Sequence, residues 1–174
     1  YGSLSVKFSG AGATNITPVN GQAITLRVPE GVISGPITVY NLKGTNVSAD
    51  SFLVRPAVSG FVPTSGRAGT NVVITGTNLL GVTSIQFTGL AAPDFTVLSN
   101  GAIRVTVPLS ATTGKILVNA PAGFSQLTNN FVVQPTINGF TPTFGPAGTS
   151  VTVFGANFNV GTPAVSFNGV SAAT

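Results

Sequence analysis

The 174-residue sequence contains no cysteine and no histidine. Without thiols, a disulfide scaffold and a thiolate metal site are excluded, and the redox compartment cannot be read from the chain. Without imidazole or thiol groups, catalysis by a histidine base or a cysteine nucleophile is excluded as well. The acidic residues are Glu30, Asp50 and Asp94, which lie far apart in the sequence. We therefore expect no catalytic site, no metal site, no cofactor and no enzymatic activity.

Charge is also scarce, because only 6% of the residues are charged, against about 25% in ordinary soluble proteins. Hydrophobic residues make up 43% of the chain, so we expect a folded core rather than disorder. The basic residues are scattered: Lys7, Arg27, Lys43, Arg55, Arg67, Arg104 and Lys115. Because a surface that follows a phosphate backbone needs clustered cations, we expect no nucleic-acid partner.

Long apolar runs and large aromatics are rare too. No apolar stretch approaches the ~18 residues that span a bilayer, so we expect no membrane span. Tryptophan is absent, and the tyrosines are Tyr1 and Tyr40, which disfavours a sugar-binding platform. Because the first residue is Tyr1 rather than methionine, we expect the N-terminus to have been processed or cut.

A long motif is present twice. The stretch from Pro56 to Asn78 returns from Pro135 to Asn157 with an offset of 79 residues. The recurring pairs include Phe61/Phe140, Pro63/Pro142, Gly66/Gly145, Gly69/Gly148, Gly76/Gly155 and Asn78/Asn157. A fixed period of this kind indicates a tandem array, and its length matches one small sandwich domain.

The local pattern predicts an all-β fold of tandem immunoglobulin-like sandwiches. Short runs of Val, Ile, Thr and Phe alternate with clusters of Gly, Pro, Asn and Ser, which is typical of strands and turns. Between residues 56 and 134 we expect strands at Ala57–Val62, Asn71–Thr77, Ser84–Thr88, Phe95–Leu98, Ala102–Val107, Gly114–Asn119 and Asn130–Gln134. Asn100-Gly101 predicts a tight hairpin between two of them.

The flanking segments match different parts of this 79-residue unit. Residues 1–55 repeat its later part, since Val6-Lys7-Phe8 corresponds to Ile85-Gln86-Phe87. Residues 135–174 repeat its early part. We therefore expect a C-terminal part of one domain (1–55), a complete domain (56–134) and an N-terminal part of a further domain (135–174). The two ends overlap by 16 residues, since 174 = 2 × 79 + 16, which indicates a window from a longer array.

The ordered motif P-x-x-x-G-F-x-P-x-x-G-x-x-G-T-x-V-x-x-x-G-x-N, followed by V/I-x-F-x-G, V-P, G-x-I and F-x-V, resembles the IPT/TIG domain. The resemblance covers residues 56–134 completely and both flanking part-units. It implies an immunoglobulin-like sandwich of the early-set kind. It leaves function open, since such domains occur in transcription factors, cell-surface receptors, bacterial surface proteins and secreted enzymes.

The motif residues also have physical roles in a sandwich. Pro63 is expected to mark an edge strand, Gly66 and Gly69 to allow a tight connection, and Gly76 to allow a bulge or a close backbone approach. The aromatic residues expected to fill the core are Phe61, Phe87, Phe131 and its repeat equivalent Phe52. These roles favour maintenance of the fold over any chemical role.

Three functions fit the sequence to different degrees. The first is a non-catalytic structural module of a bacterial extracellular fibre, stalk or adhesin, at the cell surface or outside the cell, that self-associates into filaments. Its low surface charge supports association with neighbouring repeats. The alternative is a spacer or carbohydrate-binding appendage of a secreted polysaccharide-degrading enzyme, with cell-surface or matrix polysaccharide as partner. A nuclear DNA-binding protein fits least. A Lys–Asn isopeptide crosslink from Lys115 or Lys7 has no partner indicated by spacing.

Overall fold

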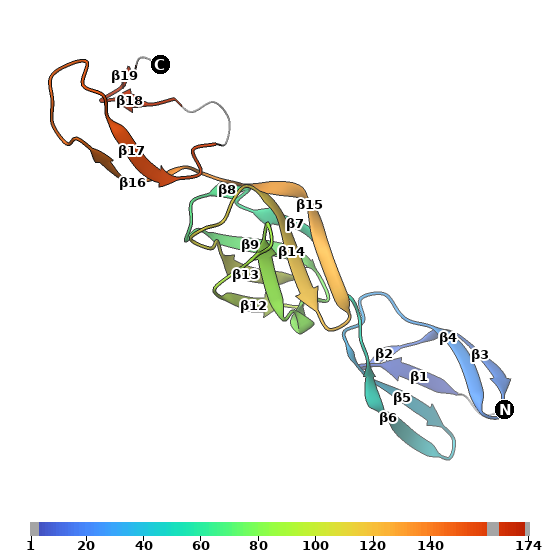
Figure 1. Cartoon of the computed structure of the whole chain (residues 1–174). Coiled ribbons are helices and arrows are strands. Elements are labelled where there is room, and N and C mark those ends of the chain that lie inside the picture. The colour runs from blue at the N-terminus through green and yellow to red at the C-terminus, as the bar shows by residue number, and fades with distance from the viewer. Residues whose placement is uncertain (1–3, 160–163, 173–174) are drawn as a thin grey trace.

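The computed structural model describes residues 4–159 and 164–172. Strands and connecting loops make up nearly all of these residues, as the sequence predicts. Figure 1 shows three groups of strands that follow one another along an elongated molecule, with the two termini at opposite ends. We call these groups the N-terminal segment (residues 4–55), the central unit (56–134) and the C-terminal segment (135–172).

The central unit is a sandwich of two sheets. One sheet has the order β12-β13-β9-β7, formed by β12 (Phe95–Ser99), β13 (Ala102–Thr106), β9 (Asn71–Thr77) and β7 (Ala57–Val62). The other has the order β11-β10-β14-β15-β8, formed by β11 (Leu90–Ala91), β10 (Ser84–Phe87), β14 (Gly114–Ala120), β15 (Gly123–Val133) and β8 (Ser65–Gly66). A short 3₁₀ helix, η1 (Leu79–Gly81), follows β9.

The core of the central unit is built by alternation along these strands. Ile74 on β9 and Ile103 on β13 lie opposite each other and are fully buried, whereas Arg104 on the other face of β13 is exposed. Such a period of two places one face of a strand in the core and the other in water. The ring of Phe131 lies 6.1 Å from that of Phe61, so it joins the two sheets across the core.

Most strands of the central unit lie where the sequence predicts them, and Asn100-Gly101 connects β12 to β13. The prediction that the last strand begins at Asn130 is wrong, because β15 begins at Gly123. Its first half is rich in polar residues, and its pairing with β14 shifts register between Lys115 and Leu117, so the apolar alternation is interrupted. The two-residue strands β8 and β11 are too short to give a periodic signal.

The N-terminal segment has strand pairing like that of the later part of the central unit. One sheet has the order β2-β1-β5-β6 and a second consists of β3 and β4. The bounds are β1 (Ser5–Phe8), β2 (Ala11–Gly12), β3 (Thr14–Asn20), β4 (Ala23–Arg27), β5 (Gly35–Asn41) and β6 (Gly44–Phe52). The pairing of Val6 with Val39 repeats that of Ile85 with Val118 in the central unit.

The C-terminal segment has strand pairing like that of the early part of the central unit. Its strands are β16 (Thr136–Thr141), β17 (Thr152–Ala156), β18 (Ser166–Phe167) and β19 (Val170–Ser171). Phe140 pairs with Val153 between β16 and β17, as Phe61 pairs with Ile74 between β7 and β9.

The expectation that Phe52 fills a core as Phe131 does is met only in part. Phe131 is fully buried, whereas Phe52 is 37% exposed. The ring centroids of Phe52 and Phe8 lie 5.1 Å apart in an edge-to-face arrangement. The rest of the ring is open because the described residues of its segment include no counterparts of β7 and β9.

Candidate functional site

The groups that sequence analysis considered for chemistry are separated and exposed. Glu30, Asp50 and Asp94 all lie on the surface, and the described ranges hold no group of three His, Cys, Asp or Glu residues that could bind a metal. Lys115 lies opposite Asn130 on the ladder between β14 and β15, and both residues are exposed. A lysine becomes a nucleophile through burial, so this pair lacks the environment that an isopeptide crosslink needs. Within residues 4–159 and 164–172, no helix is long and apolar enough to cross a bilayer.

The recurring motif lies where the chain changes sheets. Pro63 ends β7, an edge strand of one sheet, and two residues later β8 pairs in parallel with β15 of the other sheet. Position 66 has room only for glycine, since a Cβ there would lie 2.6 Å from Thr70 Oγ1. Gly69 has a φ of 84°, in the region that favours glycine.

The second copy of the motif has the same geometry. Pro142 ends the corresponding strand β16 one residue after Thr141. A Cβ on Gly145 would contact the Thr149 side chain, and Gly148 has a φ of 90°. The turn closes with a hydrogen bond of 3.1 Å from Thr149 N to Pro146 O, where the first copy has Thr70 N donating to Arg67 O at 3.1 Å.

At the end of β9, the backbone comes close to the backbone of the neighbouring strand β7. A Cβ on Gly76 would contact the carbonyl oxygen of Ala57, and a Cβ on Gly155 would contact that of Thr136. Two residues after each glycine, Asn78 and Asn157 adopt left-handed φ values of 59° and 60°. These asparagines turn the chain out of the strand at the same point of each repeat.

Asn78 also reaches the connection between the N-terminal segment and the central unit. Its Nδ2 donates a hydrogen bond of 3.3 Å to the carbonyl oxygen of Arg55. The Arg55 side chain in turn donates from Nε to the carbonyl oxygen of Ala122 at 3.0 Å. Pro56, the next residue, is buried. We call these contacts the Arg55 joint; they tie the last residue before the central unit to two of its loops.

Glycine at position 123 is part of the Arg55 joint. Gly123 has a φ of 127°, and a Cβ there would lie 3.0 Å from Arg55 Nε. The Arg55 side chain therefore occupies the space that a side chain at position 123 would take. Sequence analysis missed this role of Arg55, because the residue one period later is Gln134 and no repeat signal marks the position.

A recurring hydrogen bond lies just before each connection between units. Thr113 Oγ1 accepts a hydrogen bond of 2.9 Å from Val133 N, and one period earlier Ser34 Oγ accepts one of 2.8 Å from Val54 N. Each hydroxyl accepts from a backbone N–H two residues beyond the last pair of its hairpin, which is Phe131 with Gly114 in the central unit and Phe52 with Gly35 in the N-terminal segment. Sequence analysis did not detect this recurrence, because Ser34 stands where Thr113 stands one period later.

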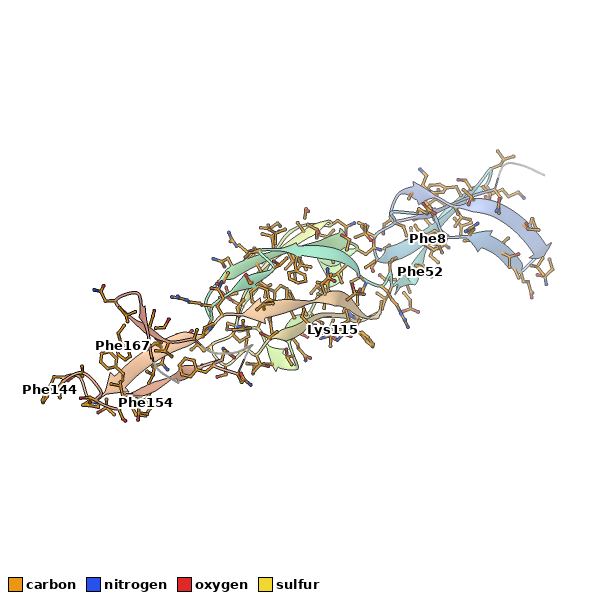
Figure 2. The ribbon with its side chains drawn as sticks, turned by 90° about the horizontal axis from the view of Figure 1, so that it is seen from above. Phe8, Phe52, Lys115, Phe144, Phe154 and Phe167 are labelled. Atoms are coloured by element: carbon orange, nitrogen blue, oxygen red, sulfur yellow. The ribbon has the colours of Figure 1, made fainter. Side chains whose placement is uncertain are left out.

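The C-terminal segment has an open apolar groove of about 620 Å³, and Phe140, Val153 and Phe167 are among its lining residues. Figure 2 shows Phe144, Phe154 and Phe167 together at this end of the molecule. Phe144 is 86% exposed. Figure 2 places Phe8 and Phe52 in the segment at the opposite end. Phe52 and Phe140, the counterparts of the core residues Phe131 and Phe61, are thus 37% and 50% exposed, whereas Phe8, the counterpart of Phe87, is buried.

Several solved structures are similar to this chain. Surface glycan-binding protein PbSGBP-B from Prevotella bryantii is 17% identical, with a TM-score of 0.47, over 73% of this chain and 33% of that one. SGBP-B from a complex xyloglucan utilization locus in Bacteroides uniformis is 16% identical, with a TM-score of 0.43, over 74% and 41%. An auxiliary nutrient binding protein from Bacteroides thetaiotaomicron is 19% identical, with a TM-score of 0.43, over 48% and 22%.

The present chain therefore spans less than half the length of each of these proteins. A comparison with curated proteins found no match. The sequence profile of the IPT/TIG domain matches residues 56–133 and again residues 135–174. These two matches together cover more than half of the chain and include both copies of the recurring motif. The chain belongs to the IPT/TIG domain family.

Proposed function

We propose that this chain is a non-catalytic spacer in a protein of the cell surface or the extracellular space. Residues 1–55 (the C-terminal part of a domain), 56–134 (a complete domain) and 135–174 (the N-terminal part of a further domain) belong to consecutive sandwich units that hold the neighbouring parts of the protein at a set distance. The recurring residues of the motif maintain the turns and core of each unit and bind no ligand. The observation that carries the proposal is the Arg55 joint, because a spacer has to fix the angle between its units.

The Arg55 joint restricts motion in two ways. Val54 is held by Ser34 of the N-terminal segment, and Pro56 is already buried in the central unit, so Arg55 alone connects the two. Hydrogen bonds then hold both its carbonyl oxygen and its side chain. A connection of this length has little linker entropy, and its units move as a semi-rigid rod. The elongated arrangement in Figure 1 fits such a rod.

Distance measurement between two spin labels tests the spacer. The chain has no native cysteine, so Lys43→Cys in the N-terminal segment and Leu109→Cys in the central unit give two defined labels. We expect a narrow distance distribution in chains diluted with unlabelled protein. Arg55→Ala should broaden it, and the matched control Arg67→Ala, a charge removed away from the joint, should not. A broad distribution in the parent chain would contradict the proposal.

Carbohydrate binding by this chain itself is the second candidate function. The similar structures include proteins whose names describe glycan binding, which gives xyloglucan and mixed-linkage glucan as ligands to test. In the N-terminal segment, Lys7 Nζ lies over one face of the Tyr40 ring, 5.2 Å from its centroid. The most exposed aromatic residue of the central unit is Phe124. Affinity electrophoresis in gels that contain either glucan distinguishes the functions. Unchanged mobility supports a pure spacer, and retardation that Phe124→Ala abolishes supports an appendage that binds sugar.

A further inference from the structure

The sheet of the central unit that contains β10, β14 and β15 turns one face away from the core. On the core side of this sheet, Ile85 and Val118 are buried and lie opposite each other. Because successive side chains of a strand point to opposite faces, the residues between the buried ones point outward. We call six of these residues the outer face: Ser84, Gln86, Leu117, Asn119, Phe124 and Gln126.

An exposed aromatic ring lies at one end of the first row of the outer face. Ser84 pairs with Asn119, and Asn119 pairs with Phe124. Phe124 is 65% exposed, although phenylalanine is among the residues most often buried in a core. Beside it, Asn119 Nδ2 donates a hydrogen bond of 3.1 Å to Ser84 Oγ, which holds the Asn119 amide in position. The first row therefore combines an apolar ring, an ordered amide and a hydroxyl group.

The second row consists of two amides on either side of an apolar side chain. Gln86 pairs with Leu117, and Leu117 pairs with Gln126. Gln86 and Leu117 are half-buried, and Gln126 is exposed. Each glutamine amide has two N–H donors and a carbonyl acceptor. Lys115 is the single charged residue in the sequences of β10, β14 and β15, so the outer face itself is neutral.

The N-terminal segment has an aromatic residue in the equivalent row. One period before the first row, Ser5 pairs with Tyr40, and Tyr40 pairs with Thr45. Lys7 Nζ lies over the Tyr40 ring, 5.2 Å from its centroid, so this ring turns a flat face toward the surface. The packing of the core does not require an aromatic residue here, because this row points away from the core. An aromatic residue nevertheless recurs in it, on the middle strand in one unit and on an outer strand in the other.

We propose that the outer face binds a neutral polysaccharide, whose chain lies across β10, β14 and β15. The ring of Phe124 packs against the C–H face of one sugar residue, because both surfaces are apolar and leave water on contact. The amides of Asn119, Gln86 and Gln126 pair with sugar hydroxyl groups, which both donate and accept hydrogen bonds. The proposal rests on the second candidate function, carbohydrate binding, and names the surface that performs it.

The chemistry of the outer face favours this ligand over two others. A nucleic acid or an anionic polysaccharide is held by clustered cations, and the six residues of the face include no cation. The centre of a protein interface is enriched in aromatic residues, Met and Arg, whereas four of these six side chains are amides or hydroxyl groups. A neutral sugar chain matches them, because uncharged amides satisfy its hydroxyl groups and one exposed ring covers its apolar side.

Nuclear magnetic resonance of the full chain locates the ligand. Soluble mixed-linkage glucan, and separately xyloglucan, is titrated in while the side-chain NH₂ signals of asparagine and glutamine are followed. We expect the signals of Gln86, Asn119 and Gln126 to shift with at least one of the two glucans, and those of Gln22 and Gln134, outside the outer face, to stay in place. Shifts confined to other residues would overturn the outer face as the site and leave carbohydrate binding standing. No shift with either glucan would overturn both, and the spin-label distances across the Arg55 joint would still decide the spacer function separately.

Substitutions then test the individual side chains. Phe124→Ala should weaken binding by about tenfold and Gln126→Ala by about three- to tenfold, the range that an aromatic contact or one net hydrogen bond supplies. The matched controls are Leu98→Ala, an exposed apolar residue of β12 in the other sheet, and Gln22→Ala in the exposed turn between β3 and β4. Both controls should bind as the parent chain does. Calorimetric titration with the glucan that gives the shifts measures the dissociation constants, and equal affinities of all four variants would overturn the proposal.

Discussion

The ring of Phe87 meets the ring of Phe131 edge-on, with centroids 5.5 Å apart and planes at 81°. Phe87 lies on β10 and Phe131 on β15, at opposite sides of β14 in the same sheet. Phe61 reaches Phe131 from the other sheet. Phe131 therefore packs against aromatic residues of both sheets, and it is the residue on which the core of the central unit should depend most.

Phe131→Ala should destabilise the chain by about 3–5 kcal/mol, because a fully buried phenylalanine leaves a cavity when it is shortened. Denaturant unfolding followed by circular dichroism measures the loss. Phe124→Ala is the matched control on the same strand, since Phe124 is 65% exposed, and it should change stability by less than about 0.5 kcal/mol. A loss below about 1 kcal/mol for Phe131→Ala would mean that this ring does not support the core.

Gly76→Ala should destabilise the central unit by about 1–3 kcal/mol, as overpacking does in a tight site. The added methyl group would contact the Ala57 carbonyl oxygen and the Val58 backbone, neither of which can rotate away. Gly81→Ala in η1 is the control, because a Cβ there meets no atom within 4 Å. Thermal unfolding of the two variants compares them, and an equal Tm would contradict the close approach.

Thr113→Val should weaken the end of β15 by about 1–3 kcal/mol, because the Val133 N–H loses its acceptor inside the protein. The substitution nearly preserves volume, so the loss reports the hydrogen bond. Thr112→Val, at an exposed neighbouring position, is the control. Hydrogen exchange at the Val133 amide measures the effect locally, and unchanged protection in Thr113→Val would show that Oγ1 is dispensable.

The fold of the central unit could be predicted because its signals are local or periodic. The alternation in Ile103, Val105 and Val107 and the hairpin dipeptide Asn100-Gly101 each specify structure within a few residues. The spacing of 79 residues then transfers the same pattern to both flanking segments.

The contacts of the Arg55 joint could not be predicted in the same way. Arg55 and Ala122 are 67 residues apart, the acceptor is a backbone carbonyl group that any residue provides, and glutamine replaces arginine one period later. The partial exposure of Phe52 could not be predicted from the sequence either. Its local sequence matches that of Phe131, and its burial depends on strands that its own segment does not contain.

Any association of these chains with one another should be nearly insensitive to sodium chloride. Only 6% of the residues are charged, and residues 135–174 carry no charged side chain, so few ion pairs can form between chains. Raising ionic strength from 0.1 M to 1 M shortens the Debye length from about 10 Å to about 3 Å, which weakens exposed ion pairs but leaves apolar contacts in place. Ammonium sulfate should strengthen association, because excluded salts favour burial of apolar surface. Sedimentation in the two salts at matched ionic strength measures both effects. Dissociation by sodium chloride would contradict this prediction and would show that charged residues of the N-terminal segment or the central unit hold the chains together.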